Sequence, residues 1–274
     1  MTINMIKLNL TNQYNSDIAY ERFVFPDGQD HIEIISPLNT QTPVTIIASL
    51  RNASDLFILL QAVEILRQEG IEKIHLEIPY LLAARMDRRM KIGGPISLKI
   101  IANLINSLNF VKVDIYDPHS EVSLTLIDRS HAMSTTHFID SILSRIPGQP
   151  VLVAPDAGAA KKTEAIAKIF NLDVVYCTKS RSKETGYISK VRIENPEILP
   201  HKTCLIVDDI CDGGATFIGL AKELKKHTSM KMYLAVSHGI FSKGLEQLSD
   251  FEQVYTTNSY KVTRHPKLTT YNLW

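Results

Sequence analysis

The stretch CLIVDDICDGGATF (residues 204–217) begins as an apolar strand, ends in a turn with two glycines, and carries Asp208, Asp209 and Asp212 within five positions. A strand, a glycine-containing turn and a following helix together present backbone N–H groups to an anionic phosphate. Carboxylates accept hydrogen bonds from sugar hydroxyls, or hold a magnesium ion with its waters. The stretch therefore predicts a site for a phosphorylated sugar. The alternative is that Asp212 caps the helix while Asp208 and Asp209 are solvated.

The same strand–turn–helix pattern recurs along the chain, with short β-rich runs alternating with segments of helical apolar spacing. The expected strands are residues 44–50, 73–81, 111–119, 150–158, 172–178, 202–209 and 231–239. The expected helices are residues 55–70, 95–110 with Pro95 in the first turn, 161–171 and 217–227. This alternation predicts parallel sheets covered by helices. SRIPGQP (144–150) is the candidate linker, so we expect two α/β domains, residues 1–146 and 147–274.

Composition narrows the possible functions. With 274 residues, 45% of them apolar and 22% charged, the chain is typical of a globular protein. The 30 lysines and arginines balance the 29 acids, which argues against a non-specific nucleic-acid or membrane-surface partner. The three cysteines, Cys177, Cys204 and Cys211, lack metal-ligand spacing. The N-terminus lacks the signal-peptide pattern, and no apolar run approaches the roughly 18 residues of a membrane span. We expect a cytoplasmic protein.

Charged loops follow several of the expected strands, where ligands bind in open α/β sheets. They are ARMDRR (84–89), DPHSE (117–121), APDAG (154–158) and DDICDGGAT (208–216). Any one of them could be an ordinary turn or helix cap, because Asp, Gly and Pro are common there. Four such loops at strand ends indicate a ligand site.

The motifs resemble a known family. CLIVDDICDGGAT resembles the phosphoribosyl-diphosphate-binding signature shared by type I phosphoribosyltransferases and ribose-phosphate diphosphokinases. PYLLAARMDRR followed by PISLKIIANLI resembles the nucleotide-binding segment of the diphosphokinases, which type I phosphoribosyltransferases lack. FPDGQDHIEI, YDPHSE, APDAGAAKKTEAIAK and VSHGIFSKG resemble further segments in the family's order. Over roughly residues 20–260, the chain is identified as a divergent ribose-phosphate diphosphokinase.

The resemblance implies two domains of type I phosphoribosyltransferase-like architecture, each a mainly parallel sheet flanked by helices. It implies Mg²⁺-dependent transfer of diphosphate from ATP to the anomeric hydroxyl of ribose 5-phosphate, giving phosphoribosyl diphosphate and AMP. It also implies a homodimer or larger homo-oligomer. A phosphoribosyltransferase acting on a base is disfavoured, because residues 20–140 would then have no purpose.

The resemblance also implies roles for individual residues. ATP binding falls to Arg85, Met86 and Asp87, and to Phe25, Asp27 and Gln29 of a neighbouring subunit. Ribose-phosphate binding falls to Asp208, Asp209, Asp212, Gly213, Gly214, Ala215 and Thr216. His119 and Asp156 are the implied metal ligands. Lys179, Arg181 and His119 are the implied catalytic residues. From the residues alone, TKSRSKETG is a solvated basic loop and His119 a hydrogen-bonding loop residue. His238 is assigned a structural role.

Departures from the family pattern leave the acceptor open. Met86 stands where the family has Gln, and Gln29 where it has Glu. DGGAT replaces a D-T-G-G-T-like turn, so Gly213 stands where the pattern has a hydroxyl donor. A larger ribosyl phosphate such as ADP-ribose is one alternative acceptor. A non-catalytic regulatory homologue is another alternative, although the acids and cations of the predicted site are present.

Overall fold

The computed structural model describes residues 5–181 and 188–274, and the chain divides into two compact units. Unit 1 extends to Ser134 and includes Trp274, and unit 2 covers Thr135–Leu273. The division thus comes earlier than the expected boundary between residues 146 and 147. The reason is α4 (Thr136–Leu143), which buries Phe138 and Ile142 in a core cluster of unit 2.

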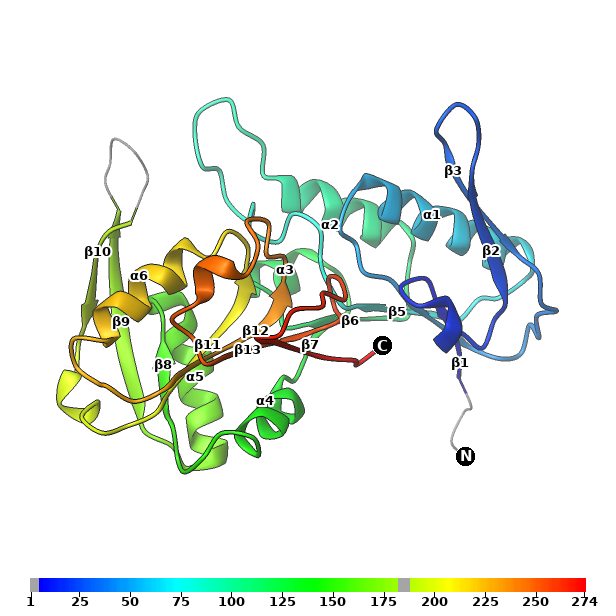
Figure 1. Cartoon of the computed structure of the whole chain (residues 1–274). Coiled ribbons are helices and arrows are strands. Elements are labelled where there is room, and N and C mark those ends of the chain that lie inside the picture. Colours follow the sequence, from blue (N-terminus) through cyan, green and yellow to red (C-terminus); the bar gives the residue numbers. More distant parts are fainter. Residues whose placement is uncertain (1–4, 182–187) are drawn as a thin grey trace. The chain divides into compact units, whose positions relative to one another are not determined.

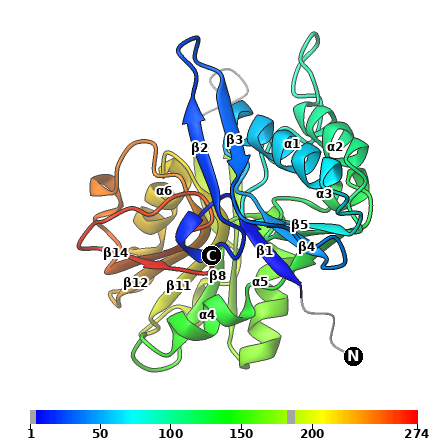
Figure 2. The ribbon, with the colours of Figure 1, turned by 90° about the vertical axis from the view of Figure 1, so that its right-hand side faces the viewer.

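Unit 1 is a five-stranded parallel sheet with helices packed against it (Figures 1 and 2). The strand order is β1-β4-β5-β6-β7, and the bounds are β1 Ile6–Asn9, β4 Val44–Ile47, β5 Ile74–Ile78, β6 Lys112–Tyr116 and β7 Ser130–Met133. The helices are α1 Ala53–Gln68, α2 Ser97–Ser107 and α3 Glu121–Leu126. This parallel α/β organisation is the one expected from the alternating pattern.

Local sequence explains where these helices begin and end. The Asn52 side chain accepts a hydrogen bond from the backbone of Asp55 (2.9 Å) and caps α1, whose other end is followed by Gly70 at φ +82°. The predicted glycine stop signal is therefore confirmed. The position predicted for Pro95 is wrong, because α2 begins at Ser97 and the proline precedes the helix.

A two-stranded antiparallel hairpin, β2 (Tyr20–Val24) with β3 (Asp30–Ile34), completes unit 1. Its turn includes Gly28 at φ +89°, a conformation that glycine adopts without strain. Arg22 Nη2 donates to Asp30 (3.0 Å) and to the Ser54 hydroxyl of α1 (3.0 Å), which ties the hairpin to the first turn of that helix. The tip itself is exposed.

Unit 2 is a seven-stranded sheet in the order β10-β9-β8-β11-β12-β13-β14, parallel except for the pairing of β9 with β10. The strands are β8 Val151–Ala154, β9 Val174–Arg181, β10 Ile188–Ile193, β11 Cys204–Cys211, β12 Met232–Gly239, β13 Gln253–Thr257 and β14 Leu268–Tyr271. With α4, the helices of this unit are α5 Ala157–Phe170 and α6 Ala215–Leu224.

The central strands of unit 2 are buried on both faces, as parallel strands covered by helices require. All eight residues of β12 and all four of β8 are buried. Because β11 pairs with both β8 and β12, the loops after these strands meet at one edge of the sheet. Among the described helices, none combines the length and apolar character that crossing a membrane requires.

Candidate functional site

Three carboxylates meet at the carboxyl edge of the unit 2 sheet. Asp156 follows β8, while Asp208 and Asp209 lie near the end of the adjacent strand β11, whose Ile206 is in register with Val153. All three acids are half-buried. The backbone N–H of Asp209 donates to Asp208 Oδ1 (3.0 Å), and Asp156 Oδ1 accepts from the backbone of Ala159 (3.1 Å) as the N-cap of α5. The structure therefore brings together the acids that the sequence predicted in two separate loops.

These acids perturb one another. Burial raises the pKa of the Asp208 carboxyl well above its usual range, and the negative charges of Asp209 and Asp156 raise it further. A cation or a set of hydroxyl donors at this edge would relieve the repulsion. Carboxylate oxygens are the hard donors that Mg²⁺ prefers, and it commonly uses one or two of them together with substrate phosphates. Although no group of three or more metal-binding side chains forms a cage in residues 5–181 and 188–274, the acids fit magnesium of this kind.

Replacing Asp208 with Asn is expected to stabilise the unliganded protein. The raised pKa means that the ionised carboxylate is unfavourable in the fold, so the stability of the wild type falls as the pH rises through that pKa. The gain in the variant should accordingly be largest at mildly alkaline pH and shrink on acidification. Relief of about 1 kcal/mol would raise Tm by ~2–4 °C in a domain of this size. Thermal melts across pH check this, and a variant of lower Tm at alkaline pH would contradict it.

The glycine turn after β11 leads directly into α6. The N-cap of this helix is Gly214 at φ +74°, with no side-chain cap hydrogen bond, so the alternative in which Asp212 caps the helix is wrong. A Cβ at Gly214 would lie 3.2 Å from Leu248 Cδ2, so the positive φ and the tight packing both favour glycine there. Ala215 opens the helix and is exposed, and Asp212, Gly213 and Thr216 are half-exposed. The backbone N–H groups at this helix start suit an anion.

Lys179 and Arg181 lie two positions apart at the end of β9. The strand pairs Lys179 with Val191 and Arg181 with Ile188 of the antiparallel neighbour β10. Their side chains, and residues 182–187 of the predicted loop, lie outside the described residues. The catalytic role of these two cations therefore stays a prediction.

In unit 1 the loop after β5 meets the loop after β6, since the two strands are parallel neighbours. The Asp87 side chain is only 2% exposed and accepts a hydrogen bond from Arg88 Nε (2.8 Å), whose own side chain is 74% exposed. This bond from Arg88 is the first cause of a lowered pKa at Asp87, and Ser120 and His119 contribute to the same shift. Asp87 thus anchors an outward-facing guanidinium, which the sequence had not singled out.

Arg85 and Met86 of the same loop are exposed, and so is His119, which stands in the loop between β6 and α3. This arrangement gives unit 1 a second cluster of predicted site residues. An exposed arginine beside a held guanidinium can bind phosphates, because guanidinium groups form strong charge-assisted hydrogen bonds with them.

Phe25, Asp27 and Gln29 form the hairpin tip rather than part of that cluster. The backbone N–H of Phe25 donates to Gln29 O (2.9 Å), and Asp27 Oδ1 accepts from the backbone of Gln29 (3.1 Å). The rings of Phe25 and His31 lie 5.2 Å apart, yet Phe25 is 40% exposed. In Figures 1 and 2 the hairpin and the loop leading into α2 stand apart within unit 1. The role of the tip in a neighbouring subunit stays a prediction.

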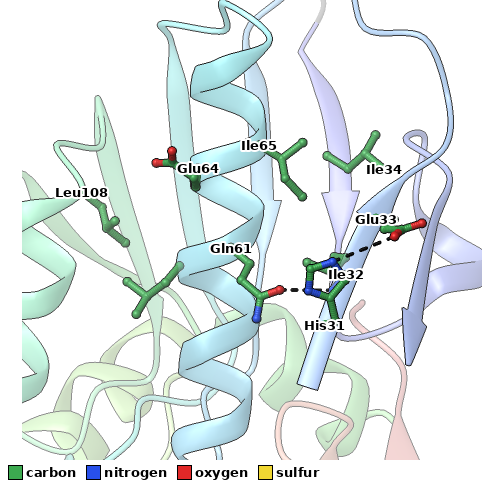
Figure 3. A pocket seen from close by; sticks show the side chains of 9 residues that line it. His31, Ile32, Glu33, Ile34, Gln61, Glu64, Ile65 and Leu108 are labelled. Atoms are coloured by element: carbon green, nitrogen blue, oxygen red, sulfur yellow. Dashed lines mark hydrogen bonds and ion pairs between the residues drawn. The ribbon is translucent and has the colours of Figure 1, made fainter. Parts of the chain in front are cut away.

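A cavity of about 760 Å³ lies between β3 and α1 (Figure 3). Its wall includes His31, Ile34, Gln61 and Leu108. Gln61 holds the two elements together, because its Nε2 donates to Asp30 O (2.9 Å) and its Oε1 accepts from the backbone of Ile32 (3.3 Å). The cavity is lined by none of the predicted site residues and so carries no part of the site.

Two α/β units with mainly parallel sheets and charged loops at their strand ends place the chain in the phosphoribosyltransferase-like class. The family model described as "N-terminal domain of ribose phosphate pyrophosphokinase" matches residues 12–108. The family model described as "Phosphoribosyl transferase domain" matches residues 132–261. The chain belongs to the ribose-phosphate pyrophosphokinase family, that is, the ribose-phosphate diphosphokinases, which are enzymes. The family expected from the motifs is thereby confirmed.

Two curated relatives support this membership. The ribose-phosphate pyrophosphokinase of Sulfurisphaera tokodaii is 31% identical over 250 residues, covering 88% of this chain and 84% of the relative. That of Pyrococcus furiosus is 30% identical over 241 residues, covering 86% and 84%. The crystal structure of phosphoribosylpyrophosphate synthetase from Mycobacterium smegmatis matches with a TM-score of 0.81 at 20% identity, covering 95% of this chain and 88% of that one. The last match shows the fold, which is the expected one.

Proposed function

We propose that the protein transfers diphosphate from ATP to the anomeric hydroxyl of ribose 5-phosphate, giving phosphoribosyl diphosphate and AMP. The observation that carries the proposal is the carboxylate cluster of Asp156, Asp208 and Asp209 beside the glycine turn of α6, within a chain of this family. Carboxylates accept hydrogen bonds from ribose hydroxyls, and the turn offers N–H groups to the 5-phosphate. Unit 2 thus supplies the acceptor half of the chemistry.

The ATP half is proposed for unit 1. Arg85 and the guanidinium of Arg88, held by Asp87, would bind the triphosphate. Exposed Met86 offers an apolar surface for adenine, as does Phe25 of a neighbouring subunit. The latter role requires a homodimer or larger assembly, with the cytoplasm as its expected location.

In the proposed reaction the anomeric oxygen attacks the β-phosphorus of ATP. The bond from that phosphorus to the bridging oxygen of the α-phosphate breaks, AMP departs with the electron pair, and the hydroxyl proton is released to solvent. Negative charge builds on the transferred diphosphate and on AMP, so cations fixed nearby lower the barrier. Lys179 and Arg181 are proposed for that task. Magnesium would neutralise part of this charge when bound. Its ligands predicted from the sequence are Asp156 and His119, and the carboxylates of Asp156 and Asp208 are suited to it.

The test is to incubate the protein with ATP, magnesium and ribose 5-phosphate and to identify the nucleotide product. Diphosphate transfer yields AMP in an acceptor-dependent manner, whereas transfer of one phosphoryl group would yield ADP. Absence of AMP with every ribosyl phosphate would contradict the proposal and favour a non-catalytic homologue. If ADP-ribose were used at least about tenfold more efficiently, a free-energy preference of roughly 1.4 kcal/mol, the acceptor would be reassigned.

A further inference from the structure

The turn after β12 is held against the glycine turn after β11. The backbone N–H groups of Ile240 and Phe241 both donate to Cys211 O (2.9 and 3.1 Å), and that of Ser242 donates to Asp212 O (3.1 Å). Phe241 is 5% exposed and anchors the turn in the core of unit 2. Lys243, the residue after Ser242, is therefore held beside Gly213.

Contacts at Gly213 show where the Lys243 side chain lies. A Cβ built on Gly213 would lie 3.5 Å from Lys243 Cδ, 3.6 Å from Cε and 3.7 Å from Cγ. The methylene stem thus covers the glycine at van der Waals distance, and the ammonium sits one bond beyond Cε. Gln247 Nε2 also donates to Lys243 O (3.1 Å), which braces the turn from its other side. A Cβ at position 213 would touch this stem at an ordinary van der Waals distance, whereas longer side chains would press against it.

The Lys243 ammonium is exposed, and within residues 5–181 and 188–274 no carboxylate lies within ion-pair distance of it. Other lysines of unit 2 do pair: Lys226 with Glu223 (2.6 Å) and Lys231 with Glu252 (2.6 Å). Covering a stem while the head stays in water is ordinary behaviour for lysine. What distinguishes Lys243 is that its stem lies beside Gly213, the residue before the N-cap Gly214 of α6, and this N-cap has no side-chain hydrogen bond. The start of a helix favours an anion.

We propose that Lys243 binds the terminal phosphate of the acceptor and selects phosphate monoesters over diesters. The inference rests on the proposed function, since it names the residue that recognises the acceptor's phosphate. A monoester carries close to two negative charges at neutral pH and a diester carries one, so a nearby cation attracts the monoester more strongly. The lysine also supplies a donor next to Gly213, a residue that has no hydroxyl. The acceptor class is therefore a ribose ending in a free phosphate.

The test compares Lys243→Met with Lys243→Arg and with Lys222→Met. Lys222 lies exposed in the last turn of α6, so its loss removes the same charge from the other end of that helix. Calorimetry measures the binding of ribose 5-phosphate and of its methyl phosphodiester to each protein. We expect Lys243→Met to weaken ribose 5-phosphate binding about tenfold and diester binding by less than about threefold, as loss of a charge-assisted hydrogen bond implies. Lys243→Arg and Lys222→Met should stay near the wild type.

A second variant guards against an indirect effect. Gly213→Thr places γ atoms against the Lys243 stem, so it should weaken monoester binding by displacing the ammonium, and Lys243→Met should then add little in that background. An unchanged preference for the monoester in Lys243→Met would overturn the inference, as would a wild type that binds neither compound or prefers the diester. Because binding is measured without ATP, a wild type that binds but forms no AMP would instead reject the proposed reaction and leave Lys243 decided by calorimetry.

Discussion

Replacing Lys179 or Arg181 with Ala is expected to lower kcat by about 10²- to 10⁴-fold while the KM for ATP changes little, as for donors that act mainly in the transition state. A loss of this size corresponds to roughly 3–5 kcal/mol of barrier. The physical reason is charge: the transferred diphosphate and the departing AMP become more negative as the reaction proceeds, so a fixed cation stabilises the transition state more than the bound substrates. Lys179→Arg and Arg181→Lys should recover part of the activity.

The matched control is Arg192→Ala in the adjacent strand β10. Arg192 is paired in register with Thr178 of β9, and its side chain is 73% exposed and 3.9 Å from Glu194. It removes the same charge from the same ribbon without touching the predicted loop, so kcat should be retained. Steady-state rates of AMP formation and circular dichroism of each variant provide the measurement. If both alanine variants turned over at nearly the wild-type rate, the segment would be a solvated basic loop.

The central α/β elements could be predicted from sequence because each carries its own local signal. Alternating apolar runs marked β4, β5, β6, β8, β11 and β12, and the helix spacing marked α1 and α5. The elements that were missed lack such signals. The strands of the hairpin β2–β3 were not predicted, since β2 is mostly exposed and lacks an apolar pattern. The strand β14 is defined by its pairing with β13. Hairpin and edge pairing depend on partners elsewhere in the sheet.

Within the candidate site, sequence located the acids but not their interactions. Asp208 and Asp209 were found from one motif and Asp156 from another, yet their mutual repulsion depends on the pairing of β11 with β8. The buried partner of His238, the Ser259 hydroxyl at 2.8 Å from Nδ1, is likewise contributed from beyond the next strand, β13.

Lys243 shows the same limit most clearly. It lies inside a segment that carried the family resemblance, but its contact with Gly213 arises from hydrogen bonds between two turns about thirty residues apart in the chain. The spacing of residues along a sequence does not predict such a contact. Departures from a family pattern are therefore best interpreted in pairs once the fold shows which positions touch.

The carboxylate cluster offers a test in which stability and binding move in opposite directions. Asp208 is destabilising when ionised, because burial and the charges of Asp209 and Asp156 oppose it. A group kept in the fold at that cost is expected to serve a ligand, here by accepting hydrogen bonds from ribose hydroxyls. Asp173→Asn is a suitable control, since Asp173 is a 63% exposed acid of the same unit, 3.8 Å from Lys202. It directly precedes β9 and so lies at the start of a strand, not at a carboxyl end.

Asp208→Asn and Asp209→Asn are each expected to weaken ribose 5-phosphate binding about 10- to 100-fold, because a charge-assisted hydrogen bond to a hydroxyl is worth roughly 1.5–3 kcal/mol. ATP affinity should largely survive, since the proposed ATP residues lie in unit 1. Calorimetry with each substrate separately, in the presence of magnesium, measures both quantities for the two variants and for Asp173→Asn. Asp208→Asn should bind the acceptor less well while melting at a higher temperature, so its lost affinity cannot be ascribed to unfolding. If ATP affinity collapsed while acceptor affinity stayed intact, the two substrates would have been assigned to the wrong loops.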